Sequence, residues 1–107
     1  MNGGVSYVVD SGEQEFTHVV ATVTASGATT LYTPSSGKRI RVRWFYAIND
    51  PGSTASPLIK AFLGGTEIYR VYAISKRQMV TGPVDGVLSV NLSEAAEVAV
   101  TVLLEEV

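Results

Sequence analysis

The segment ATTLYTPSSGKRIRVRWFYAI, residues 28–48, contains a short polar strand, a proline- and glycine-bearing connection and the longest alternating run of the chain. From Lys38 onward, successive side chains point to opposite faces if the backbone is extended. One face then carries Arg39, Arg41 and Arg43. The other face is apolar and forms the predicted core side of a long β-strand; it consists of Ile40, Val42, Trp44, Tyr46 and Ile48.

The rest of the chain consists of short β-branched segments separated by turn signals. Residues 16–25, 58–63 and 67–74 are predicted strands, and Gly64-Gly65 between the last two indicates a hairpin. Turn signals recur at intervals of about 8–12 residues, and no helical period is present. The pattern predicts an all-β, single-domain antiparallel protein of about eight strands, folded as a β-sandwich or a barrel. Two later alternating segments add predicted core residues, namely Leu88, Val90, Leu92, Val98, Val100 and Val102.

The composition fits one self-supporting domain. The chain has 107 residues, no cysteine and a formal charge of −2, so its stability must come from packing alone. We expect residues 1–11 to form a flexible N-terminal arm and residues 12–107 to form the β-sandwich domain. Hydrophobic residues make up 46% of the chain and charged residues 17%, which hints that a partner covers part of the surface. No signal peptide or membrane span is expected.

Candidate catalytic and metal-binding residues are few. His18 is the only histidine, and zinc would need further histidine or cysteine ligands. Asp10, Asp50 and Asp85 lie in predicted turns, where aspartate ordinarily caps backbone donors, and the dense acidic spacing of a calcium loop is absent. No serine lies in a nucleophile motif. We therefore predict no catalytic residue, no metal site and no cofactor, and we do not expect an enzyme.

The arginine row has two interpretations. Three like charges about 7 Å apart could follow a nucleic-acid backbone, or they could pair with glutamates on a neighbouring strand. Glu97, Glu105 and Glu106 lie on or beside the predicted closing strand. The negative net charge favours internal pairing or a protein interface over nucleic acid. The predicted interface residues are Val5, Tyr7, Arg39, Arg41, Arg43, Tyr69 and Tyr72.

Three features occur in a fixed order: TLYTPSSGK at residues 30–38, GGTEIYRVYAI at residues 64–74, and LSVNLS at residues 88–93. Together they resemble small tailed-phage virion proteins of the capsid decoration, or cement, type, over residues 28–107. The resemblance implies a jelly-roll-like sandwich that binds the major capsid protein on the outer capsid surface and stabilises the shell. It also implies synthesis in the host cytoplasm, no catalytic residues, no nucleic-acid or membrane partner, and a homo-oligomer in which a trimer is favoured and a dimer is possible.

Two alternatives remain. A head-fibre or tail-associated β-sandwich that binds host glycans would need Trp44 and the tyrosines to be exposed. The alternation places Trp44 with Ile40 and Val42 in the core, which counts against this alternative. An enzyme is remote because no acid, base or nucleophile pair can be proposed. In the decoration model, the N-terminal arm is one expected capsid-binding element.

Overall fold

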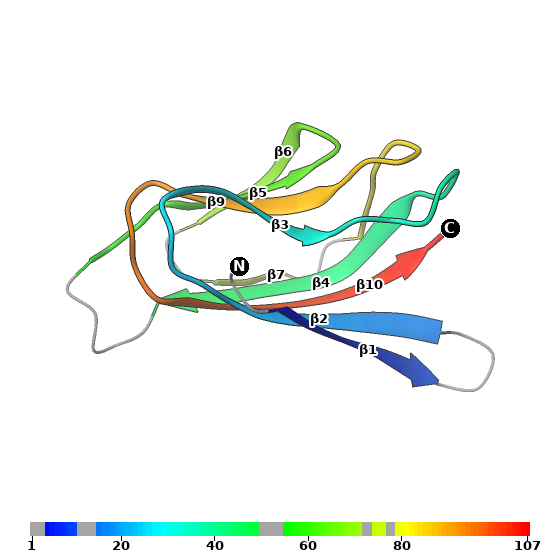
Figure 1. Ribbon diagram of the computed structural model, residues 1–107, viewed down its shortest axis with the longest axis horizontal. Helices are drawn as coiled ribbons and strands as arrows, with labels where there is room; N and C mark the ends of the chain where they lie inside the picture. The colour runs from blue at the N-terminus through cyan, green and yellow to red at the C-terminus, as the bar shows by residue number, and fades with distance from the viewer. Residues whose placement is uncertain (1–3, 11–14, 50–54, 72–73, 77–78) are drawn as a thin grey trace.

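The computed structural model is an all-β sandwich in which two antiparallel sheets face each other (Figure 1). The structure describes residues 4–10, 15–49, 55–71, 74–76 and 79–107, with side chains for 16–49, 55–70 and 79–107. Within these residues there is no helix long and apolar enough to span a membrane. The described strands are β1 (Gly4–Asp10), β2 (Glu15–Val23), β3 (Gly27–Tyr32), β4 (Ile40–Asn49), β5 (Ile59–Leu63), β6 (Thr66–Val71), β7 (Ile74–Lys76), β8 (Val80–Thr81), β9 (Leu88–Leu92) and β10 (Val98–Glu106).

The strand order is that of a jelly roll. The larger sheet has the order β1-β2-β10-β4-β7, with β8 also on β4, and the smaller sheet has the order β3-β9-β5-β6. β10 occupies one edge of β4, so β7 and β8 lie along its other edge as two pieces of one interrupted strand. Setting β1 aside, eight strands remain in the arrangement of a jelly roll. The predicted sandwich of about eight strands is therefore confirmed.

The core lies between the sheets and is built from alternate residues of the central strands. The predicted core residues of β9 and β10 are confirmed, because each is at most 1% exposed. Burying one such valine or leucine side chain contributes about 1.5–3 kcal/mol, which makes the interleaved aliphatic layer the main source of stability. The six residues are Leu88, Val90, Leu92, Val98, Val100 and Val102.

The long strand β4 contains a β-bulge at Arg43. Val42 pairs with Leu104 of β10. The next pair is Trp44 with Leu103, which leaves Arg43 as an extra residue between two paired positions. A bulge of this kind shifts the side-chain alternation by one position beyond it. Arg43 and Trp44 therefore lie on the same side of the sheet.

The bulge makes the second half of the predicted core side wrong. Ile40 and Val42 precede the bulge and are fully buried, as predicted. Beyond the bulge, Phe45 and Ala47 are the fully buried residues, and neither belongs to the predicted core. The side chains that the alternation placed in the core lie instead on the opposite side of the sheet; they are Trp44, Tyr46 and Ile48.

Part of the predicted N-terminal arm belongs to the larger sheet. The backbone of β1 pairs with β2 along its whole length, from Gly4 opposite Ala21 to Asp10 opposite Glu15. Residues 1–3 and 11 of the predicted arm lie outside the described part of the chain.

Contacts between loops close one end of the sandwich, near the C-terminus in Figure 1. Arg39 and Val107 exchange two backbone hydrogen bonds of 2.9 Å. The Asp85 carboxylate accepts a hydrogen bond of 2.7 Å from the backbone N–H of Gly37, and the Asp85 N–H donates to the carbonyl of Lys38 at 2.8 Å. These bonds hold the connection before β4 against the loop before β9.

Candidate functional site

The side of the larger sheet turned away from the core carries an unusual set of apolar side chains. Every described strand of the smaller sheet lies on the other side (Figure 1). Val20 and Ile48 on this side are 42% and 40% exposed. We call the outward residues of β2, β10 and β4 the outer face. It consists of Phe16, His18, Val20, Thr22, Arg41, Arg43, Trp44, Tyr46, Ile48, Ala99, Thr101, Leu103 and Glu105.

These residues form rows across the three strands. In the central row, Thr101 of β10 pairs with Val20 of β2 on one side and with Tyr46 of β4 on the other. Residues directly opposite in an antiparallel pair lie on the same face, so each row is a line of neighbouring side chains. The row on the C-terminal side of β10 is His18, Leu103 and Trp44, and the row on its N-terminal side is Thr22, Ala99 and Ile48.

An open hollow of about 400 Å³ lies at one end of the outer face. It is lined by Phe16, Arg43, Trp44 and Leu103. The Arg43 guanidinium lies 5.4 Å from the centroid of the Phe16 ring, within the range of a cation–π contact. The Trp44 ring stacks on Tyr46 with centroids 5.7 Å apart and an interplanar angle of 17°. The hollow therefore has aromatic walls and one cationic group.

Charge on the outer face is unevenly distributed. Glu105 accepts a hydrogen bond of 2.8 Å from Arg43 Nη1 and lies 3.9 Å from Arg41 Nη1. Arg41 also donates from Nε to the hydroxyl of Thr81 at 3.1 Å. The prediction that the arginine row meets a glutamate of this chain is confirmed for Arg41 and Arg43. Among the described side chains at this end of the face, two arginines against one glutamate give one excess positive charge.

The two other glutamates considered as partners of the arginines lie elsewhere. Glu106 accepts hydrogen bonds from the Tyr32 hydroxyl and, at 3.3 Å, from the Ser35 N–H, which link β10 to β3 and the following loop. The hydrogen bond from Tyr32 lowers the pKa of Glu106, and burial together with Glu106 raises the pKa of Tyr32 to about 12. Glu97 is exposed just before β10, at the opposite end of the outer face from Arg41.

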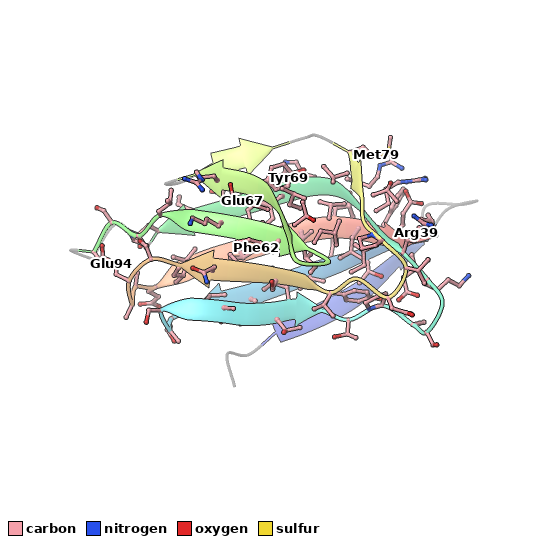
Figure 2. The ribbon with its side chains drawn as sticks, turned by 90° about the horizontal axis from the view of Figure 1, so that it is seen from above. Arg39, Phe62, Glu67, Tyr69, Met79 and Glu94 are labelled. Atoms are coloured by element: carbon pink, nitrogen blue, oxygen red, sulfur yellow. The ribbon has the colours of Figure 1, made fainter. Side chains whose placement is uncertain are left out.

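The outward side of the smaller sheet is different in kind. Figure 2 looks onto this side and shows Phe62 and Glu67 on neighbouring strands. Glu67 pairs with Arg70 through two hydrogen bonds of 3.0 Å. Phe62 is half-buried, and the remaining outward residues of β3, β5 and β9 are polar or small: Ala28, Thr30, Lys60, Ser89 and Asn91. The smaller sheet thus presents an ordinary solvent face, whereas the larger sheet presents an apolar one.

The other predicted interface residues have different outcomes. Tyr69 is 4% exposed and stacks on Phe45 with centroids 5.4 Å apart, so its assignment to an interface is wrong and it belongs to the core. Burial raises the pKa of its hydroxyl. Arg39 is exposed beyond the outer face, at the end of the sandwich where Met79 also lies (Figure 2).

Three predicted interface residues lie on segments with less description. The backbone of Val5 pairs with Val20 and that of Tyr7 pairs with His18, which places both at register positions beside the outer face. Tyr72 lies outside the described residues.

Phe16 and Leu103 are members of the candidate site that the sequence pattern did not single out. Leu103-Leu104 is a pair of large apolar residues in an otherwise alternating strand, and this pair was the available signal that β10 has an apolar outward residue. Among the described residues, no cluster of three or more histidine, cysteine or acidic side chains could hold a metal ion. His18, half-buried on β2, has apolar neighbours in its row.

No family model matches the chain, and no curated protein matches it. A function must therefore be inferred from the geometry and chemistry of the outer face.

Proposed function

We propose that the protein is a phage capsid decoration protein, a non-catalytic module that binds the outer surface of the major capsid shell and stabilises it. The observation that carries the proposal is the difference between its two sheet faces. One face is polar, while the other exposes valine, isoleucine, leucine and aromatic groups over several strands. A contiguous apolar patch rimmed by charges is typical of a protein-binding surface.

The jelly-roll body supports this role. Its core is closed by side chains of both sheets, and loop contacts fix the end near the C-terminus. A rigid body loses little conformational entropy on binding, which favours tight association for a given contact area. Jelly rolls occur in many capsid proteins, and this analogy at the level of the fold is consistent with the sequence resemblance.

The proposed mechanism is avidity. A decoration protein meets a lattice of identical sites, so a weak contact is multiplied when the protein is itself an oligomer with several capsid-binding surfaces. Copies that bridge neighbouring capsid subunits then oppose their separation under internal pressure. No bond is made or broken in this mechanism.

The direct test uses capsids of the virus that encodes the chain, assembled without it. Purified protein is added, and co-sedimentation measures binding while scanning calorimetry measures the capsid melting temperature. We expect saturable binding at a fixed ratio to capsid subunits and a higher melting temperature. Bovine serum albumin serves as the non-binding control. No co-sedimentation at saturating protein would refute the proposal.

A second candidate, glycan binding, gains support from Trp44. The glycan hypothesis requires exposed aromatic rings, and Trp44 lies half-buried beside the open hollow, stacked on Tyr46, rather than in the core. Aromatic rings that flank an open site are a common platform for sugars. The solvent accessibility of Trp44 does not by itself separate the two functions, because both predict that its fluorescence can be quenched. A sugar-dependent fluorescence change that is lost in Trp44→Ala would favour the glycan role, and its absence across a glycan array would favour decoration.

A further inference from the structure

We infer that the outer face binds the outer face of a second copy of this chain, giving a twofold dimer in which the two β10 strands run antiparallel across the interface. The twofold axis lies between the two packed sheets, runs across the strands and passes close to Thr101, the centre of the middle row. The inference rests on the proposed function and deepens it by naming the first partner of the module. The dimer occupies the outer face, so the capsid is bound by surfaces that the dimer leaves exposed. The inference favours a dimer over the trimer expected from the resemblance. Self-association can be measured without any capsid, so the two proposals can fail separately.

The size of the face suits a stable dimer. β2, β10 and β4 are 9, 9 and 10 residues long, and β1, β7 and β8 extend the sheet on both sides. With about 3.4 Å per residue and about 4.8 Å between strands, the sheet covers roughly 600 Å² of flat area. Standard interfaces bury about 800 Å² on each partner. This figure is an accessible surface area, which is larger than the flat area of the same face. A sheet-on-sheet contact over this face therefore reaches the range of specific dimers.

The row pattern is self-complementary about Thr101. A twofold axis across the strands at this residue places the row two positions before it opposite the row two positions after it. Ile48, which is 40% exposed, then faces the region of the hollow between Trp44 and Leu103 of the other copy. Because of the twofold symmetry, Ile48 of each copy would pack into the hollow of the other copy, against its aromatic and leucine side chains. This arrangement removes from water Val20 and Ile48, the exposed large apolar side chains of the outer face.

The charges fit the same register. Glu105 and Glu97 lie four residues on either side of Thr101. The twofold arrangement therefore places Glu97 of one copy opposite Glu105 of the other, beside Arg41 and Arg43, whose two positive charges exceed the single negative charge of Glu105. Glu97 has no hydrogen bond or ion pair within the described part of the chain, so it is available for this contact.

The inclination of packed sheets keeps these charged groups within reach of each other. Two packed sheets are inclined by about 30°, which displaces positions four residues from the axis sideways by roughly 7 Å, within the reach of an arginine side chain. The reverse arrangement, with β10 strands parallel, would bring the arginine-rich ends together. A second copy is therefore the occupant whose charge matches that of the face.

The experiment measures self-association of the full chain by sedimentation equilibrium from about 1 μM to about 1 mM. We expect a concentration-dependent dimer. Thr101→Lys places two positive charges against each other at the axis and should weaken dimerisation at least tenfold. Ser89→Lys, at a half-buried outward position of β9 in the smaller sheet, is the matched control and should leave it unchanged. Circular dichroism checks that each variant is folded.

A charge swap tests the register. Glu97→Arg and Arg41→Glu should each weaken the dimer roughly tenfold, because each replaces an attraction by a repulsion at two symmetric sites. The double variant should recover most of the lost affinity. Failure of the double variant to recover, equal effects of Thr101→Lys and Ser89→Lys, or a monomer at all concentrations would each overturn the inference. A monomer that still binds capsids refutes only the dimer, and a dimer that does not bind capsids refutes only the decoration role.

Discussion

Replacing Phe45 should cost far more stability than replacing Trp44, although the plain alternation of the sequence assigns Trp44 to the core. Phe45 is 0% exposed and stacks on Tyr69. Phe45→Ala therefore loses the transfer free energy of the ring and leaves a cavity, at a cost of about 3–5 kcal/mol, near the upper value because the aromatic contact is also lost. Trp44 is open to solvent on one side, and Trp44→Ala should cost about 1–2 kcal/mol through partial burial and its stacking on Tyr46.

The measurement is urea unfolding followed by far-ultraviolet circular dichroism, since Trp44 is the only tryptophan and one variant lacks it. Protein is kept dilute so that self-association does not add to the apparent stability. With a slope of about 1–1.5 kcal/mol per molar urea, the midpoint should fall by about 2–5 M for Phe45→Ala and by about 0.7–2 M for Trp44→Ala. If Phe45→Ala does not fold, Phe45→Leu should still lower the midpoint by about 1 M. A larger loss for Trp44→Ala than for Phe45→Ala would show that the alternation is unbroken and would refute the bulge.

Two further predictions concern the closure of the sandwich. Tyr32→Phe should cost about 1–2 kcal/mol at neutral pH by removing the hydrogen bond to Glu106. The pKa of Glu106 is lower in the folded than in the unfolded protein, so this carboxylate stabilises the fold at pH values above its unfolded pKa. That stability is lost as the pH falls through the folded pKa, so the wild-type advantage over Tyr32→Phe should shrink below about pH 4. The pKa of Tyr32, raised from 10.0 to about 12, contributes stability that is lost as pH rises between these values, so the advantage should shrink there too. Urea midpoints across pH test both windows, and a constant difference would contradict the assignment. At Gly64, φ is 62° and an added Cβ would come 2.3 Å from the Pro83 ring, whereas at Gly65, φ is 85° and the space is open. Gly64→Ala should therefore destabilise by about 2–4 kcal/mol and Gly65→Ala by about 1–2 kcal/mol in the same assay, and equal losses would show that Pro83 yields freely.

The fold could be predicted because turn signals and β-branched segments are local properties of the sequence. β9 alternates throughout and β10 alternates as far as Val102, so the buried sides of Leu88 and Val100 followed directly from the period of two. The strand order could not be derived in this way, because pairing between distant segments depends on the whole chain. No strand order was predicted; the resemblance to decoration proteins implied only a jelly-roll-like sandwich, with which the observed sheet order agrees.

The candidate site could be predicted only in part, and the reason is the bulge. The residues from Trp44 to Tyr46 are all aromatic, so their hydrophobicity is the same whichever way the alternation runs. The next two residues favour the wrong buried side, because Ile48 is more hydrophobic than Ala47. The structure nevertheless buries Ala47 and exposes Ile48. A bulge is set by the pairing with a strand more than fifty residues away, and a single-strand pattern cannot detect it.

The same one-residue shift links stability and association without making them the same property. The bulge at Arg43 points the Phe45 side chain into the core and brings Arg43 and Trp44 side by side on the outer face. Substitutions at Phe45 should therefore change the free energy of unfolding, while Thr101→Lys should change the dimer affinity with little effect on the unfolding of the dilute monomer. If the apolar outer face were incidental, Thr101→Lys would alter neither quantity, because the half-buried Thr101 lies on the outward side of β10, away from the core. Measuring both quantities on one pair of variants thus separates a surface that binds from one that is only tolerated.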